Sequence, residues 1–338
     1  MDEKAAFADG MNRYCAEKQN HVEGGKNTCN FPYLPYSFLL DNDEDVQSFL
    51  KIIEQNPRKA FLLKESWVNM GNGITIMGPN SKELKDVQNS LKDGSNDEYT
   101  AEGEYIIQEY ICNGLLFANK FKFDLRFYWF IASIDPLIVL FHDGIGRVSS
   151  EEYTESDFSN FHAHITNTSQ KAEAVSWDDV SKVISEHFHS HREEFTDRLG
   201  TDIDPVTHVH NQMKAILVDI INAFRDTSFA LGSLTSDNGF NILALDLYID
   251  NDLDVFLIEP QSQCKLDHTT EPAMSISRKF VSDVVDVAVE VTENQQFLGK
   301  SILPLKNMGD FEVVYDMESG YQFSYEYQRP AKKKGCET

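Results

Sequence analysis

One short segment, FKFDLRF at 121–127, constrains the fold of this chain more than any other. Because successive side chains of a β-strand point to opposite faces, its four apolar residues share one face: Phe121, Phe123, Leu125 and Phe127. The opposite face carries a cation, an anion and a second cation: Lys122, Asp124 and Arg126. A row of alternating charges suits a polyphosphate bound together with a metal ion. The segment therefore predicts a long strand in the wall of a nucleotide site.

The rest of the chain reads as helices and strands arranged around this one. Before it, the sequence predicts strands at 60–64, 74–77 and 105–110 and helices at 46–54 and 81–91. After it, the sequence predicts strands at 137–141, 241–249 and 254–259, helices at 176–198, 209–224 and 275–292, and a strand pair within 311–327. We expect an α+β fold with a short helix or loose arm at 1–30, a small lobe at 31–110, a large lobe at 111–330 and a basic tail at 331–338.

Composition and charge exclude several classes of partner. The formal net charge of −25 repels nucleic acid and anionic membranes. We see no secretory signal and no stretch of about 20 apolar residues, so the chain is expected to be cytoplasmic with no membrane partner. The five cysteines are widely spaced without a CxxC pair, which favours reduced thiols over a dense disulfide framework or a zinc ribbon. The sequence RPAKKK at 329–334 reads as a solvated terminus.

The segment 241–261 predicts a β-hairpin that carries a metal site. With DNDL as the turn, Ile249 pairs with Asp254, and Asp246 lies opposite Leu257. Alternation then places four side chains on one face: Asp246, Leu257, Glu259 and Gln261. Mg²⁺ takes hard oxygen ligands and prefers one or two carboxylates together with substrate phosphates. The alternative reading is a pair of solvent-facing strand ends.

The loop SWVNMGNGI at 66–74 joins two predicted strands and carries Gly71 and Gly73. Glycines let backbone N–H groups approach phosphate oxygens closely, and Lys64 at the end of the preceding strand adds a positive charge. No GK[ST] follows, so the loop is not a Walker loop. A plain hairpin turn is the alternative.

Tyr105–Ile111, YIIQEYI, can supply a shelf for an adenine ring. Gln108 offers a side-chain partner, and the extended backbone of Glu109, Tyr110 and Ile111 offers N–H and C=O groups to the ring edge. An ordinary core strand is the alternative reading of this segment.

Two further motifs suit the second substrate. Arg147 follows a strand and can hold a substrate carboxylate with its guanidinium, although surface arginines are common. In HITN at 164–167, a positioning role for Thr166 and Asn167 is favoured over a catalytic role for His164. The histidines at 187–191 are spaced by two, which spreads them around a helix and disfavours a metal site there.

Taken in order, these pieces resemble the tubulin tyrosine ligase-like family of ATP-grasp ligases. The matching stretches lie within about 31–290: FLLKESWVNMGNGITIM, YIIQEYI, KFKFDLRFYWFIAS, DPLIVLFHDGIGRVSSEEY, HITN and ALDLYIDNDLDVFLIEPQSQ. The resemblance implies an ATP-grasp fold, in which two antiparallel sheets clamp ATP and Mg²⁺.

Site residues follow from the motifs and from this resemblance. Those expected at the nucleotide are Lys64, Gly71, Gly73, Gln108, Glu109, Tyr110, Ile111, Lys122 and Asp124. Those expected at the transferring group and the acceptor are Arg126, Arg147 and Asn167. Those expected at the metal are Asp246, Glu259 and Gln261.

The chain departs from the family pattern in four respects. Glu65 stands where the family usually has proline after the first strand lysine, and the loop carries Trp67, Val68 and Met70 among few glycines. Gln261 replaces the asparagine of the usual E-x-N metal motif and is one methylene longer. The match begins about thirty residues in, so the N-terminal domain of the tyrosine ligase itself is expected to be missing.

The resemblance implies an ATP-dependent carboxylate–amine ligase that forms an amide through an acyl phosphate. The alternative is a nucleotide-binding scaffold of the same fold that has lost turnover, a reading motivated by Glu65 and Gln261. The expected substrates are an amine and an amino-acid, peptide or protein carboxylate. A tubulin tail is the family's default substrate, but such tails are acidic and so is this chain. A free amino acid or small peptide is therefore an equal expectation.

Overall fold

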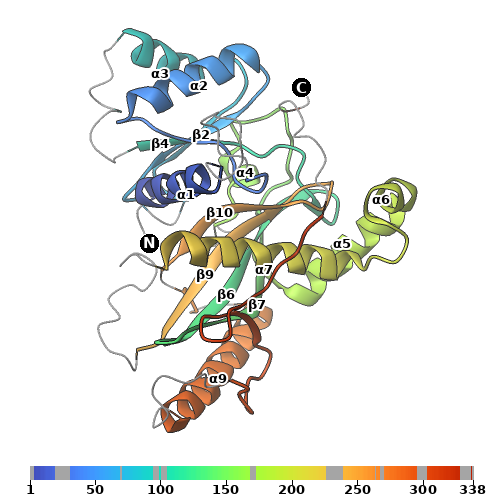
Figure 1. Ribbon diagram of the computed structural model, residues 1–338. Helices are drawn as coiled ribbons and strands as arrows, with labels where there is room; N and C mark the ends of the chain where they lie inside the picture. Colours follow the sequence, from blue (N-terminus) through green and yellow to red (C-terminus); the bar gives the residue numbers. More distant parts are fainter. Residues whose placement is uncertain are drawn as a thin grey trace.

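The computed structural model describes residues 4–19, 31–68, 71–93, 99, 105–167, 173–225, 239–262, 264–266, 270–294, 303–327 and 336. These residues form two antiparallel sheets with helices packed around them (Figure 1). Residues from strands of both sheets line one shared cavity.

The smaller sheet has the strand order β1-β4-β2-β3. Its strands are β1 (Ser37–Leu39), β2 (Phe61–Glu65), β3 (Ile74–Met77) and β4 (Tyr105–Glu109). Helices α2 (Asp43–Gln55) and α3 (Lys82–Asp93) lie together at the top of Figure 1. Their apolar faces share a core with the sheet, in which Phe49, Phe61 and Ile107 are fully buried. The sequence predicts each of these elements except β1.

The larger sheet follows the strand order β10-β9-β6-β7-β11-β12, with β5 paired to β6 and β8 to β7. Its strands are β5 (Leu116–Phe117), β6 (Phe121–Ile134), β7 (Leu137–Val148), β8 (Glu173–Ser176), β9 (Asn241–Ile249), β10 (Val255–Gln261), β11 (Glu312–Asp316) and β12 (Tyr321–Gln322). Its helices are α4 (Phe161–His164), α5 (Trp177–Ser190), α6 (Arg192–Leu199), α7 (Pro205–Phe224) and α9 (Glu271–Asn294). The sequence predicts one helix at 176–198, but His191 leaves helical geometry and separates α5 from α6.

The alternation in β6 separates two environments, as the sequence predicts. Phe123, Leu125 and Phe127 are buried in a core shared with α5 and α7. Further along β6, Tyr128 and Phe130 pack on the opposite face against α9. The near half of that opposite face carries the charged residues and lines the cavity.

The register of the β9–β10 hairpin differs from the predicted one. Ile249 pairs with Val255 rather than Asp254, and a β-bulge between Leu257 and Glu259 places Glu259 directly opposite Asp246. The extra residue of a bulge reverses the direction of the side chains beyond it. Leu257 therefore lies in the hydrophobic core and not on the polar face, contrary to the sequence prediction.

The N-terminal segment forms helix α1 (Lys4–Gln19) rather than a loose arm. The Phe7 ring stacks on Phe224 of α7 with centroids 5.5 Å apart, and Met11 is almost fully buried. Because α1 also contacts β1 and β4, it connects the larger sheet's helical layer with the smaller sheet.

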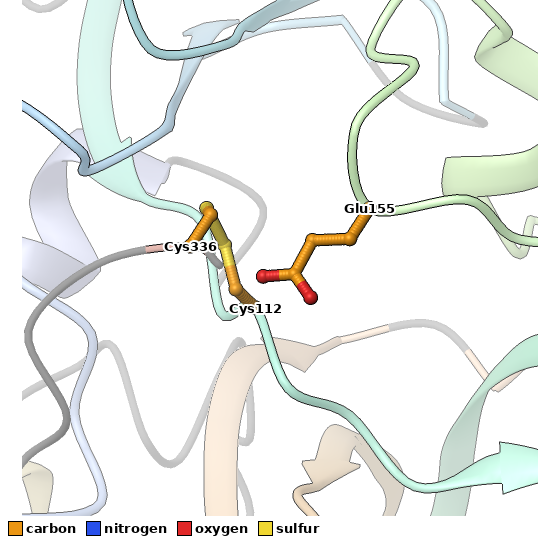
Figure 2. Close-up of side chains that lie close together, drawn as sticks. All are labelled: Cys112, Glu155 and Cys336. Carbon is orange, nitrogen blue, oxygen red and sulfur yellow. A yellow bond between two sulfur atoms is a disulfide. The ribbon is translucent and has the colours of Figure 1, made fainter. Parts of the chain in front are cut away.

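The expectation of reduced cysteines does not hold at Cys336. The segment 329–334, which is expected to be a solvated terminus, lies outside the described residues. Cys336 forms a disulfide with Cys112, which follows β4 by three residues, and the Glu155 carboxylate lies beside the two sulfur atoms (Figure 2). The Cys336 side chain is buried, and its backbone N–H donates to the carbonyl of Arg58 at 3.0 Å. Cys15 is also disulfide-bonded, whereas Cys264 is a free thiol. The positions around Cys336 lie outside the described residues.

No helix in the described part of the chain is long and apolar enough to cross a bilayer.

Reduction of the Cys112–Cys336 bond is expected to destabilise the protein. The bond closes a loop with a sequence separation of 224 residues, and removing such a link restores conformational entropy to the unfolded chain. We expect Cys336→Ser to lower the free energy of unfolding by about 2–4 kcal/mol, measured by urea denaturation without reductant. Cys264→Ser is the matched control. If wild type and Cys336→Ser unfold at the same urea concentration, the pair does not stabilise the fold.

Candidate nucleotide and metal site

A cavity of about 680 Å³ lies between the two sheets. That volume is in the usual range for a small-molecule site. Every site residue predicted from the sequence lines it, with the exception of Gly73. The remaining described lining includes Lys4, Thr166, Tyr248, Cys264, Lys265 and Leu266. The structure thus brings both glycine-loop and hairpin residues to one cavity.

Charged residues from three neighbouring strands form a buried network along one wall. Arg126 donates two hydrogen bonds to the Asp246 carboxylate, at 2.8 and 2.7 Å. Arg147 donates two to Asp124, at 2.6 and 2.5 Å, and contacts Asp246 at 3.0 Å. The Thr166 hydroxyl adds a bond to Asp124 at 2.7 Å. The pairs follow from strand register, because Arg126 stands opposite Asp246 and Asp124 opposite Arg147.

This network fixes the ionisation of its members. Burial raises the pKa of Asp246, but Arg126 and Arg147 outweigh it and leave that pKa below its usual value. Burial dominates at Asp124 and raises its pKa despite the attraction of Arg147. At Arg147, burial opposes the charge, yet the two carboxylates raise the pKa above its ordinary value. Asp246 therefore stays an anion and Arg147 a cation over the physiological range.

The oxygen atoms needed for a Mg²⁺ site gather at the β9–β10 pair. Asp246 and Glu259 stand opposite each other, and the Gln261 amide donates to Glu259 at 2.5 Å and to Asp246 at 3.4 Å. The two carboxylates are hard oxygen donors of the kind that Mg²⁺ prefers, and they fit the ion that the sequence predicts. Gln261 instead turns its amide nitrogen toward them in this structure.

Two buried lysines also line the cavity, and each donates a hydrogen bond to a neutral side chain. Lys64 donates to the Gln108 side-chain carbonyl at 2.6 Å, and Gln108 in turn donates to Ser37 at 3.2 Å. Lys122 donates to the Tyr110 hydroxyl at 2.6 Å. Burial lowers the pKa of Lys64, and it lowers the pKa of Lys122 to about 7. An anionic ligand would therefore stabilise the charged form of both lysines.

The segment predicted as the adenine shelf lines the cavity, but not every group in it is available to a ligand. The Glu109 carboxylate forms a buried ion pair with Lys59. The backbone N–H of Glu109 donates to Tyr36, and that of Tyr110 donates to Ala60. We therefore propose that Ile111 supplies the backbone donor for a ring edge.

The glycine loop closes between β2 and β3. Gly71 and Gly73 both have positive φ, at 75° and 64°, a region that L side chains rarely adopt. The Gly73 carbonyl accepts from the Glu65 N–H at 2.9 Å, so Gly73 closes the hairpin, whereas Gly71 lines the cavity.

Lys4 of α1 holds the start of this loop, and sequence reasoning did not find it. Its ammonium donates to the carbonyls of Glu65, Ser66 and Val68, at 3.2, 3.3 and 2.8 Å. The polar N-terminal sequence carries no motif for this role, because the contact exists only in the folded chain. Tyr248 was also missed, although its position two residues after Asp246 places it on the same strand face.

A solved structure identifies the fold. The chain superposes on the C-terminal domain of K. lactis Pby1, described as an ATP-grasp enzyme interacting with the mRNA decapping enzyme Dcp2. The TM-score is 0.56 and the sequence identity 17%, over 91% of this chain and 77% of that chain. Two antiparallel sheets meeting at a shared cavity are therefore an ATP-grasp fold, which confirms the sequence prediction.

The chain belongs to the tubulin-tyrosine ligase family, whose model matches residues 7–297. The human "Probable tubulin polyglutamylase TTLL2" is 24% identical over 278 residues, which cover 80% of this chain and 43% of that protein. The Tetrahymena thermophila "Probable alpha-tubulin polyglutamylase Ttll1" is 21% identical over 90% of this chain and 70% of its own length. The rat "Protein polyglycylase TTLL10" is 23% identical over 85% of this chain. This chain spans less than half the length of the human and rat relatives.

Lys4→Ala is expected to weaken nucleotide binding through the loop. The change removes the ammonium that three loop carbonyls share, so the loop loses its fixed start and must be ordered by the ligand. We expect the Kd for Mg-ATP to rise roughly tenfold, measured by calorimetry. Lys51→Ala, on an exposed site of α2, serves as control. Equal affinities for Lys4→Ala and wild type would remove Lys4 from loop positioning.

ATP affinity is expected to fall as pH rises through neutrality. Burial lowers the pKa of Lys122 to about 7, with Asp124 opposing the shift and Lys64 adding to it. Below that pH the ammonium is charged before the nucleotide arrives, whereas above it the nucleotide must also draw in a proton. From about pH 6 to about pH 8.5 the affinity should therefore fall, by up to about tenfold per pH unit above 7.

The Lys122→Met variant is the control for this pH profile, because titration of the ATP phosphates is common to both proteins. Its affinity is expected to be lower throughout and to vary less with pH. Parallel profiles for wild type and Lys122→Met would show that Lys122 does not titrate in this range.

Proposed function

We propose that this chain is an ATP-dependent ligase that joins a carboxylate to an amine. One observation carries the proposal: the paired acids Asp246 and Glu259 share a single buried cavity with the cations expected to meet a triphosphate. Those cations are Lys64, Lys122, Arg126 and Arg147. Membership of the tubulin-tyrosine ligase family and the ATP-grasp fold support the same reaction class.

The proposed binding mode divides the cavity between nucleotide and acceptor. Lys64 and Lys122 hold phosphate oxygens, and Gly71 lets the loop backbone approach them. The segment 108–111 faces the adenine ring. Asp246 and Glu259, with Gln261, hold Mg²⁺, which would neutralise charge on the phosphates. We further propose that 31–110 and 111–330 act as two lobes closing on the nucleotide, with 1–30 and 331–338 as the terminal segments.

The proposed reaction has two steps. The substrate carboxylate oxygen attacks the γ-phosphorus of ATP, so that an acyl phosphate forms and ADP leaves. The amine nitrogen then attacks the acyl carbon, phosphate leaves, and the amine loses a proton to give the amide. Arg126 stabilises negative charge on the transferring phosphoryl group. Arg147 and Asn167 orient the acceptor carboxylate, and the loop excludes water that would hydrolyse the acyl phosphate.

The departures from the family pattern do not disable the site. Glu65 does not line the cavity, and its N–H instead closes the loop onto Gly73. The Gln261 amide nitrogen donates to both acidic residues and leaves the pair of carboxylates in place. The intact pair, together with the position of Glu65, favours a working enzyme over a nucleotide-binding scaffold that has lost turnover.

We propose candidate substrates from the names of the relatives. Those relatives are named as tubulin polyglutamylases and a protein polyglycylase, so glutamate or glycine is a candidate amine donor. The acceptor is a protein or peptide carboxylate, with a tubulin tail and a small peptide or free amino acid as the two candidates. A screen for ADP release with these substrates, followed by mass spectrometry of the products, identifies donor and acceptor together. The cytoplasmic location stays a prediction.

Lys122→Ala and Glu259→Gln are each expected to reduce ADP formation by about 100-fold or more, because one removes a phosphate-facing cation and the other a metal carboxylate. Circular dichroism should show an unchanged fold. Glu152→Gln is a matched control, since the Glu152 side chain is exposed and forms an ion pair with Lys120 on the surface. Nucleotide binding by the wild type without ADP release for any carboxylate–amine pair would instead support the scaffold alternative.

A further inference from the structure

A chain of hydrogen bonds runs from the Lys122 ammonium to a backbone carbonyl outside the charged network. Lys122 Nζ lies 2.6 Å from the Tyr110 hydroxyl oxygen. That hydroxyl lies 2.7 Å from Nδ1 of His164, and Nε2 of His164 lies 2.8 Å from the Asp157 carbonyl oxygen. The mechanism proposed above uses Lys122 but gives neither the Tyr110 hydroxyl nor His164 a role.

The direction of every bond in this chain is determined by its two ends. The Asp157 carbonyl can only accept, so His164 carries its proton on Nε2 and presents Nδ1 as an acceptor. The Tyr110 hydroxyl donates its single proton to Nδ1, and its oxygen accepts from Lys122. An ammonium can only donate. Every donor in this series of hydrogen bonds therefore faces an acceptor.

Burial keeps the two intermediate groups in the required protonation states. Burial and the nearby charge of Lys122 lower the pKa of His164 to about 4, so the imidazole is neutral at physiological pH. Burial raises the pKa of Tyr110 well above its ordinary value, so the hydroxyl keeps its proton. Both side chains are almost fully buried, which limits competition from water.

Aromatic rings surround the same ammonium. Lys122 Nζ lies 3.8 Å from the Tyr110 ring centroid, 4.8 Å from that of Tyr248 and 5.8 Å from that of Tyr153. The charged groups that act on it are Asp124 of its own strand, Lys64 of β2 and Glu155 of the segment that follows β7. The rings restrict the ammonium without neutralising it.

We infer that Tyr110 and His164 are positioning residues that hold the Lys122 ammonium in place for the nucleotide phosphates. The inference rests on the proposed function, because it needs an anionic ligand at Lys122. A lysine head group on a four-carbon stem has many rotamers, and holding it beforehand lowers the entropy that ligand binding must remove. Tyr110 follows β4 of the smaller sheet, whereas His164 ends α4 and Lys122 lies in β6. This series of hydrogen bonds thus connects residues from both sides of the cavity to Lys122, the proposed phosphate contact.

A purely structural role is the competing explanation. His164 stacks on Phe158 with ring centroids 5.3 Å apart, and Tyr110 contacts Phe158 edge-on at 5.9 Å. Loss of either side chain can therefore disturb packing as well as the hydrogen bonds. The test must separate acceptor chemistry from packing.

The experiment measures the Kd of a non-hydrolysable ATP analogue with Mg²⁺ by calorimetry on the full chain. Tyr110→Phe keeps the ring and removes the hydroxyl, and His164→Ala removes the acceptor. Each is expected to raise the Kd roughly tenfold, and the double variant by little more than either alone, because both interrupt the same chain. His164→Asn restores an acceptor near the position of Nδ1 and is expected to recover most of the affinity.

Combination with Lys122→Ala separates this inference from the proposed function. In the Lys122→Ala background, Tyr110→Phe is expected to have no further effect on the Kd. If Lys122→Ala weakens binding while Tyr110→Phe and His164→Ala do not, the positioning role is wrong and the proposed function stands. If Lys122→Ala itself leaves the Kd unchanged, Lys122 does not contact the phosphates, and the positioning role of Tyr110 and His164 is also wrong. Equal losses in His164→Asn and His164→Ala, matched by equal losses of thermal stability, would also overturn the inference in favour of packing.

Discussion

The site depends on the burial of charged residues of β6 between two strands that carry the opposite charges. Asp124 stands opposite Arg147 of β7, and Arg126 stands opposite Asp246 of β9. Loss of the partner of a buried ion destabilises a fold by about 3–5 kcal/mol. A shift in either strand register would therefore destabilise the folded protein strongly. Because register is fixed in this way, the partner hairpin strand places Glu259 beside the same network.

The alternating pattern made much of this wall predictable from sequence. Side-chain direction in a strand has period two, so the polar face of FKFDLRF could be assigned without knowing its neighbours. The bulge in β10 shows where that reasoning ends. Strict alternation grouped Leu257 with Glu259, but the extra residue sends Leu257 into the core. The conclusion that Asp246 and Glu259 converge was correct, although the predicted register behind it was wrong.

Contacts made by the ends of the chain could not be predicted from local pattern. Lys4 lies in a polar segment without a motif, and its role depends on α1 packing beside the glycine loop. Cys112 and Cys336 are separated by 224 positions, and spacing alone cannot identify such a pair. Lys4 lines the cavity, whereas Cys112 and Cys336 are not among its lining residues. The N-terminal helix therefore contributes to the site that the central motifs define.

The arginines and lysines of the cavity are prepared differently for an anionic ligand. Arg126 and Arg147 each form two-point bonds with a carboxylate, so their charge is already balanced. Lys64 and Lys122 instead donate to an amide carbonyl and a phenol, which orient an ammonium without carrying an opposite charge themselves. Under the proposed function, a triphosphate would meet the lysines without first displacing a carboxylate, whereas at the arginines it would compete with Asp124 and Asp246.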